Sequence, residues 1–391
     1  MTEGIADLRV LQVIAPAPFG GAESVARALS RAYPGRAHLV ALLQYGGEHP
    51  FFEQAKAEGL RVSKVTAGRR RYDLEIRALG GLIETHRPDV VHTHVYHADF
   101  VGYRAARAAG IPVVASVHGI TGGDWKDRLY QWLDLKLLRR FDGLICVSES
   151  VRDKILKAGC SPERVHLVAN PYSAQSLLTR AESREVLDLP PNVPVVGWIG
   201  RVSIEKGADL FIRALAGLPR PHPLGVIIGT GPEIERARGM ARDLGVEDTV
   251  RFAGERPNAG ELLSAFDALV LSSRTEGLPM VLLEAMGARV PIVAFAVGGI
   301  PDAVDERSAW LAPPGNIAAL SDALSNALQR KEEAIQRSDA GEEIVRQRYG
   351  AQKWANRMAE IHRTVIRHGK SARPLAEQSL GKGHIEGKDD G

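Results

Sequence analysis

The sequence is poor in cysteine and has no long apolar run. Only two of its 391 residues are cysteines, Cys146 and Cys160, which is too few for a disulfide framework, and their spacing does not match a zinc knuckle. A reducing compartment, the cytoplasm, is the simplest interpretation. No segment reaches the roughly 18 uninterrupted apolar residues of a membrane-spanning helix, since the best candidate, residues 278–300, is interrupted by Glu284 and Arg289. We therefore expect a soluble or at most peripheral protein.

Strong charge of one sign is also lacking, because the net charge is only +3. The N-terminus carries Glu3 and Asp7 in place of a basic segment, so no signal peptide is predicted. The basic excess lies in residues 1–170, where such a face is either simply solvated or attracts an anionic acceptor or the inner face of the cytoplasmic membrane. Nucleic acid is not an expected partner, since no reading motif is present. The basic residues form two groups: Arg61, Lys64, Arg69, Arg70 and Arg71, then Lys136, Arg139 and Arg140.

Short β-branched runs alternate with longer helical stretches along most of the chain. This alternation predicts parallel sheets with crossover helices. Because the alternation occurs as two consecutive series, we predict an α/β protein of two doubly wound, Rossmann-like domains that face a central cleft. The predicted strands are 9–15, 38–43, 90–94, 112–117, 143–147 and 165–168 in the first series, and 195–200, 224–229, 250–253, 268–272 and 292–296 in the second.

Changes of composition indicate the domain boundaries. Residues 1–170 form the predicted N-terminal domain, 171–194 a proline-containing linker that bears a helix, and 195–345 the C-terminal domain. Residues 346–368 are predicted as an amphipathic helix that packs back toward the N-terminal domain, and the Gly-, Lys- and Asp-rich residues 369–391 as a disordered tail. The apolar positions that recur at helical spacing are Trp354, Met358, Ile361 and Val365.

The clearest chemical signal is the segment 274–284, Arg-Thr-Glu-Gly-Leu-Pro-Met-Val-Leu-Leu-Glu. Gly277 allows a tight turn, and Pro279 suits the first turn of a helix. The free backbone N–H groups of Leu278, Met280 and Val281 would then point out of a helix end whose dipole favours anions. An ordinary helix start is the alternative interpretation.

Charged residues of the right kind accompany this helix start. Glu276 precedes it and Glu284 lies inside the helix, and a carboxylate can accept two sugar hydroxyls. Earlier in the chain, Arg201 and Lys206 stand beside a predicted strand-to-helix turn. An Arg fork and a Lys point charge make a good clamp for a diphosphate and can stabilise the charge that grows on a departing nucleotide diphosphate.

Together these motifs resemble family 4 glycosyltransferases with the GT-B fold, over residues 8–368. Their order along the chain is typical of that family, and the combination is specific for the family but only weakly specific for the sugar. The motifs are Gly20-Gly21-Ala22-Glu23, Asp89-Val90-Val91-His92-Thr93-His94, Val117-His118-Gly119, Val147-Ser148-Glu149-Ser150, Arg201 with Lys206, Gly229-Thr230-Gly231-Pro232-Glu233, Phe252-Ala253-Gly254, and Glu276 with Glu284.

The resemblance implies a retaining glycosyltransferase that moves a sugar from a UDP- or GDP-sugar to an acceptor hydroxyl, with no cofactor and no metal. It also implies a lipid-linked or polysaccharide acceptor in cell-envelope glycan synthesis. By resemblance, the catalytic residues are His118, Glu276, Arg201 and Lys206. The implied donor-binding set contains Arg201, Lys206, Glu276 and Glu284, the last on the ribose, together with Gly20, Gly21, Gly229, Gly231, Phe252, Ala253, Gly254, Gly277, Leu278, Met280 and Val281.

Histidines gather near the end of the strand 90–94. His92 and His94 share one strand face and His97 follows, a spacing that is compatible with metal ligands. No cysteine lies nearby, so structural or acceptor-site histidines are favoured over metal ligands, and His94 and His97 are the predicted acceptor-binding residues.

Three further points stay open at the level of sequence. Where many family members have Asn-Gly-Val-Asp, this chain has Asn170-Pro171-Tyr172, which weakens a donor-contacting role there but not a hinge role. The aromatic, basic stretch 125–140 is either an interfacial helix or a helix packed on the domain core. The alternatives to a transferase are a GT-B-like nucleotide-sugar epimerase or donor hydrolase, and a non-catalytic scaffold that binds a nucleotide sugar.

Overall fold

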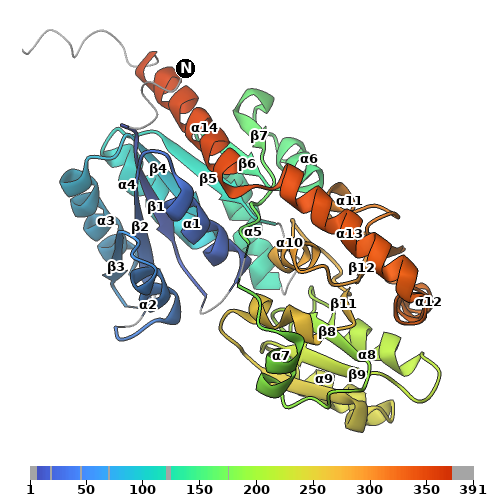
Figure 1. Ribbon diagram of the computed structural model, residues 1–391. Helices are drawn as coiled ribbons and strands as arrows, with labels where there is room; N and C mark the ends of the chain where they lie inside the picture. The colour runs from blue at the N-terminus through green and yellow to red at the C-terminus, as the bar shows by residue number, and fades with distance from the viewer. Residues whose placement is uncertain are drawn as a thin grey trace, which may run out of the picture.

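The computed structural model describes residues 7–17, 20–44, 46–68, 71–119, 125–174 and 176–371, without the side chains of 125–128 and 369–371. Arg69, Arg70 and residues 372–391 of the predicted tail lie outside the described residues. The chain forms two lobes, each an α/β layer structure (Figure 1). This confirms the predicted pair of doubly wound domains.

The N-terminal domain is built on a seven-stranded parallel sheet of order β3-β2-β1-β4-β5-β6-β7. Its central strands β4 and β5 are buried along their whole length, as expected of a parallel sheet covered on both faces by helices. The strands are β1 Arg9–Ile14, β2 Arg36–Leu43, β3 Val62–Thr66, β4 Val90–His94, β5 Val113–Val117, β6 Gly143–Cys146 and β7 Val165–Leu167; the helices are α1 Gly21–Ala32, α2 Pro50–Ala57, α3 Tyr72–His86, α4 Tyr96–Ala108, α5 Trp125–Leu138 and α6 Glu149–Lys157.

The C-terminal domain has a six-stranded parallel sheet of order β10-β9-β8-β11-β12-β13. In both sheets the strand order reverses once, beside β1 and β4 in the first and beside β8 and β11 in the second, which makes two switch points where ligands bind in such folds. The strands are β8 Val195–Ile199, β9 Leu224–Ile228, β10 Val250–Gly254, β11 Ala268–Leu271, β12 Ile292–Phe295 and β13 Trp310–Ala312; the helices are α7 Arg180–Val186, α8 Ala208–Ala216, α9 Ile234–Asp243, α10 Met280–Gly287, α11 Ile300–Ala303, α12 Ile317–Gln329, α13 Lys331–Arg348 and α14 Ala351–Ser371.

The helices at the C-terminus differ from the prediction. The predicted helix 346–368 begins inside α13, which ends at Arg348, and α14 begins only at Ala351. The break falls where the chain returns to the N-terminal domain, and α14 then runs along that domain in Figure 1. Its apolar face packs in one cluster with strand residues of the N-terminal sheet, among them Val10, Val114 and Ile145.

The two domains are joined by two chain crossings that lie side by side. The backbone N–H of Tyr172, on the way out of the N-terminal domain, donates to the carbonyl of Tyr349, on the way back, at 2.6 Å. Tyr172 also forms an isolated β-bridge with Gly350. The Tyr172 ring packs so closely on Gly287 that a Cβ there would overlap it. The linker thus forms a paired hinge.

Candidate active site

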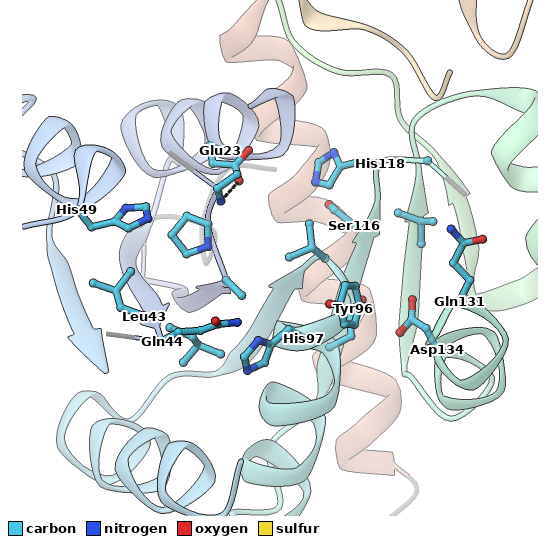
Figure 2. A pocket seen from close by; sticks show the side chains of 18 of the residues that line it. Glu23, Leu43, Gln44, His49, Tyr96, His97, Ser116, His118, Gln131 and Asp134 are labelled. Atoms are coloured by element: carbon cyan, nitrogen blue, oxygen red, sulfur yellow. Dashed lines mark hydrogen bonds between the residues drawn. The ribbon is translucent and has the colours of Figure 1, made fainter. Parts of the chain in front are cut away.

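A cavity of about 810 Å³ opens at the carboxyl edge of the N-terminal sheet (Figure 2). Its walls come from the segments that follow β1, β2, β4 and β5, and from α5. This is the edge of a parallel sheet at which ligands bind. The C-terminal domain contributes Arg201, so the cavity reaches the cleft between the domains. We call it the N-domain pocket.

His118, the predicted active-site histidine, lines this pocket at the end of β5. Its Nε2 lies 3.1 Å from His94 Nδ1, and His94 Nε2 lies 3.1 Å from Gln12 Oε1. The Gln12 amide donates to Ser30 Oγ at 2.7 Å. An amide oxygen only accepts, so with this orientation His94 is protonated on Nε2 and accepts from His118 Nε2–H. His118 Nδ1 is left unprotonated, and it has no hydrogen-bond partner within the described residues.

A second chain of hydrogen bonds lies behind the first. Tyr33 bonds His362 of α14 at 2.8 Å, and His362 bonds His92 at 3.0 Å. His92 in turn bonds Ser116 Oγ at 2.8 Å and stacks on His94 with the ring centroids 4.7 Å apart. These histidines do not gather as metal ligands: within the described ranges, no group of three His, Cys, Asp or Glu side chains is arranged to hold a metal ion.

Burial keeps these histidines neutral. Loss of solvent around the ring lowers the pKa of His118 to about 4 and that of His362 to about 3. The pKa values of His92 and His94 are held well below their ordinary range, first by burial and then by the neighbouring rings. The hydrogen bonds agree with this, since His94 must be neutral to accept from His118 and one of His92 and His362 must be neutral to accept from the other.

His94 and His97, the predicted acceptor residues, have different positions. His94 is fully buried behind His118 and is not among the lining residues, whereas His97 lines the pocket. His97 Nε2 lies 2.8 Å from the carboxylate of the buried Glu75. Between the two, Val95 has φ of 68°, a conformation that a β-branched residue adopts only under strain, and strain of this kind concentrates at functional sites.

Two lining carboxyls were missed by the sequence analysis. Asp99 on α4 is 3% exposed and bonds Thr93, and Asp134 on α5 has an enclosed Oδ1 without a hydrogen-bond partner in the described part of the chain. Nothing in their sequence neighbourhoods marks them, because the contact between α4 and α5 is a tertiary one.

The C-terminal domain presents its charged residues at the switch point of the second sheet. Lys206 Nζ lies 2.8 Å from both carboxylate oxygens of Glu276, and Ser273 donates to Glu276 at 2.6 Å. The structure therefore brings two predicted residues together as an ion pair, in which Glu276 is 7% exposed. The guanidinium of Arg201 is exposed and makes no hydrogen bond or ion pair with the rest of the described chain.

The start of α10 meets the N-terminal domain at very short range. A Cβ on Gly277 would overlap the carbonyl oxygen of His118, and a Cβ on Gly21 would come within 3.5 Å of Met280. The buried amide of Asn170 donates to the Leu278 carbonyl at 2.8 Å. The N-termini of α1 and α10 therefore converge from opposite domains, and both favour an anion between them.

The remaining predicted donor residues lie around this centre without lining the N-domain pocket. A Cβ on Gly229 would overlap the Gly200 carbonyl, and one on Gly231 the Val202 backbone, so both glycines permit close packing of two loops. The stretch Phe252-Ala253-Gly254 ends the edge strand β10. Glu284 lies inside α10, close enough to Arg27 for its carboxylate to favour the charged form of that guanidinium.

Family models match nearly the whole chain in two parts. The model for Glycosyltransferase Family 4 matches residues 19–175, and that for Glycosyl transferases group 1 matches residues 179–344. The chain belongs to glycosyltransferase family 4. It is thus an enzyme of the transferase class, as the sequence predicted.

Individual proteins agree with this family. The glycosyltransferase is 29% identical to the 2-deoxystreptamine N-acetyl-D-glucosaminyltransferase of Streptomyces fradiae, over 76% of this chain and 80% of the relative. It is 27% identical to the D-inositol 3-phosphate glycosyltransferase of Saccharomonospora viridis, over 71% and 70%. Among solved structures, Anabaena HepE in complex with UDP-glucose superimposes with a TM-score of 0.81 at 22% identity, over 91% of this chain and 100% of HepE. The fold is GT-B.

The close approach at Gly277 yields a first prediction. Gly277→Ala forces the start of α10 away from His118, and we expect transferase activity to fall about 100-fold or more, as misplacement of about 1 Å can do. Gly81→Ala is the matched control, because that helical glycine has open space around it and should gain slight stability. Equal activity of Gly277→Ala and wild type would show that this contact does not position the site.

The neutral histidines yield a second prediction, on pH. Because the native pKa values lie below the ordinary 6.5, the unfolded chain binds more protons than the native chain below pH 6.5. Stability is therefore complete above about pH 6.5 and falls as the pH drops toward 4. His362→Gln should lose less stability between pH 7 and pH 5 than wild type, measured as the urea midpoint. Parallel losses in both proteins would contradict the assignment of His362 as neutral.

Proposed function

We propose that the glycosyltransferase transfers a sugar from a UDP- or GDP-sugar to an acceptor hydroxyl, with retention of the donor configuration. One observation carries this proposal: the converging N-termini of α1 and α10, with Arg201 beside them, adjoin the N-domain pocket at His118. The anion-binding elements suit a diphosphate, and the pocket lies where an acceptor would meet the transferred sugar.

In this proposal the donor loop and the cations hold the nucleotide diphosphate. The amides that follow Gly277 bind the diphosphate, and Glu284 binds the ribose. Arg201 stabilises the charge that grows on the departing group, and Lys206 joins it from its ion pair with Glu276. Because Glu276 is held by Ser273 and Lys206, its carboxylate is fixed in place as a hydrogen-bond acceptor for the donor sugar.

The proposed reaction uses no side-chain nucleophile. The bond between the anomeric carbon and the β-phosphate oxygen breaks while the acceptor oxygen bonds the same carbon from the same face. The proton of the acceptor hydroxyl passes to the departing phosphate oxygen, so the products are the glycoside and the nucleoside diphosphate. The unprotonated Nδ1 of His118 accepts a hydrogen bond from a sugar hydroxyl, and Gln12 and His94 fix that tautomer.

The acceptor enters the N-domain pocket in this proposal. A volume of about 810 Å³ is the size of a small-molecule site and holds one or two rings. The two relatives described above are named for 2-deoxystreptamine and D-inositol 3-phosphate, which supports an acceptor ring of this size. The predicted lipid-linked or polysaccharide acceptor would place its terminal sugar in the same pocket. Within it, His97 contacts the acceptor, and His94 acts through His118.

The donor is tested by a thermal-shift screen with UDP-, GDP-, ADP- and TDP-sugars. A ligand that binds only the native state adds about 2.7 kcal/mol at 100 times its dissociation constant. We expect one nucleotide class to raise the melting temperature and Arg201→Ala to abolish most of the shift, with Arg213→Ala, an exposed cation on α8, as control.

Two results would overturn the proposal. If no nucleotide sugar shifts the wild type at millimolar concentration, the chain does not bind such a donor. If the donor binds but its sugar is only epimerised or hydrolysed with every acceptor offered, the reaction is not transfer. The anomeric configuration of a transferred sugar, read by NMR, decides between retention and inversion.

We also propose that α5 carries the predicted peripheral contact with an anionic membrane at the cytoplasmic face. Trp132 and Leu133 are 51% and 48% exposed, and Lys136 lies 3.5 Å from the Trp132 ring centroid. Exposed apolar and basic side chains on one helix suit a headgroup region. None of the helices within the described residues is long and apolar enough to cross a bilayer.

Co-sedimentation with phosphatidylglycerol vesicles tests this contact. Trp132→Ala should weaken binding several-fold, because it removes an interfacial aromatic. Ile335→Ala, which alters a 59% exposed side chain of α13, should leave binding unchanged. Equal sedimentation with uncharged phosphatidylcholine vesicles, or no effect of Trp132→Ala, would contradict the proposal.

A further inference from the structure

The charges that line the N-domain pocket are unbalanced. Its lining carboxyls are Glu23, Glu48, Asp99 and Asp134, whereas its permanent cation among the described residues is Arg201, on the cleft side. Burial lowers the pKa of His118 to about 4 and also lowers that of His49, so these two rings contribute no positive charge near pH 7. The side of the pocket that belongs to the N-terminal domain is therefore lined by carboxyl groups and has no permanent cation among its described residues.

Two of these carboxyls lie close together on packed helices. Asp99 and Asp134 come from α4 and α5, and Asp134 is close enough to disfavour the charge on Asp99. In Figure 2, Asp134 lies on the pocket wall beside Gln131 and opposite His97. Asp99 is 3% exposed and bonds Thr93, while the enclosed Oδ1 of Asp134 has no hydrogen-bond partner in the described residues.

Such a pair is unfavourable unless something compensates it. An enclosed carboxyl oxygen without a partner loses its hydration, and a second carboxyl beside it adds repulsion. Burial raises the pKa of Asp134 to about 7, and burial together with the nearby Asp134 raises the pKa of Asp99 well above its ordinary value. A cation placed between them would remove both penalties, and strongly perturbed groups in a cavity often mark a binding site.

We propose that Asp99 and Asp134 bind a protonated amino group on the part of the acceptor that enters the N-domain pocket. This rests on the proposed function and specifies its acceptor as an amino sugar or an aminocyclitol, free or at the end of a larger glycan. The ammonium donates to the Asp134 oxygen that has no protein partner and to Asp99. The acceptor is thereby oriented with its reacting hydroxyl toward His118 and the cleft.

The same lining groups suit a phosphorylated acceptor less well. A phosphate in this part of the pocket would face four carboxyls, whereas phosphate sites are built from Arg, Lys and helix N-termini. Arg201 and the starts of α1 and α10 are such elements at the cleft, and the donor diphosphate occupies them in the proposed function. The start of α4 also lines the pocket, but it carries the acidic Asp99 in its first turn. An ammonium therefore fits the pocket better than an anion.

Calorimetric binding to the full-length enzyme tests the inference with three probes of similar ring size. They are 2-deoxystreptamine, myo-inositol and inositol 3-phosphate, each added in the presence of the nucleotide diphosphate found by the donor screen. We expect 2-deoxystreptamine to bind about 10-fold or more tighter than myo-inositol. Asp134→Asn keeps the side-chain shape but removes the carboxyl group. It should abolish the preference for 2-deoxystreptamine over myo-inositol, and Asp99→Asn should do the same.

The controls separate this inference from the proposed function. Asp153→Asn, an exposed charge on α6, should leave the preference intact, and the donor thermal shift should be the same in all of these variants. If the donor shift is present but inositol 3-phosphate binds best, or Asp134→Asn keeps the amine preference, the amine inference is wrong and the transferase proposal stands. If no donor binds at all, the proposed function itself fails.

Discussion

The contact between Gly277 and the carbonyl of His118 is the constraint on which the rest of the site depends. It holds the start of α10, which belongs to one domain, directly against the end of β5, which belongs to the other. Gly299 packs on Ser148 in the same region, and Asn170 ties the Leu278 carbonyl to the linker. Because glycine is the residue that permits such backbone approach, the distance between the loop before α10 and the N-domain pocket is determined by contacts between main-chain atoms.

Movement of the domains is confined by the paired hinge. The hydrogen bond between Tyr172 and Tyr349 joins the two crossings, so both turn about one point. Beyond the hinge, α14 is anchored in the N-terminal domain by its apolar face and by His362, which bonds both Tyr33 and His92. A linker next to the site is where small backbone changes would move one domain relative to the other, as in enzymes that close around a ligand. The chain departs from the family pattern at Asn170-Pro171-Tyr172. These residues thus lie where the loop before α10 meets the linker.

The sequence was sufficient to predict the strands that carry motifs. It was insufficient for the features that depend on tertiary packing. Buried strands such as β11 are continuous apolar runs, so they were predicted, whereas the edge strand β3 has polar residues at three of its five positions and β13 has only three residues. His118 was predicted from its place at a strand end before a glycine and from its match to the family motif. His94, the partner of His118, was among the predicted residues. The second chain of hydrogen bonds was not predicted, since His362 lies 270 residues from His92 and meets it only through the path of α14. The strain at Val95 and the pairing of Asp99 with Asp134 leave no local signal either, because each depends on how neighbouring helices pack.

The distribution of charge also explains why donor and acceptor would not exchange places. The cleft side of the site offers Arg201 and two helix N-termini, while the far side of the N-domain pocket offers carboxyls. The first set suits a diphosphate and the second offers it no cationic partner, which supports one orientation of the donor in the proposed function. Neutral histidines occupy the space between them. Since His118 stays uncharged near pH 7, in the proposed function it can orient a hydroxyl without attracting the diphosphate into the N-domain pocket. Keeping these buried imidazoles unprotonated costs stability at low pH. In the proposed function, their neutrality helps to keep the two substrates apart.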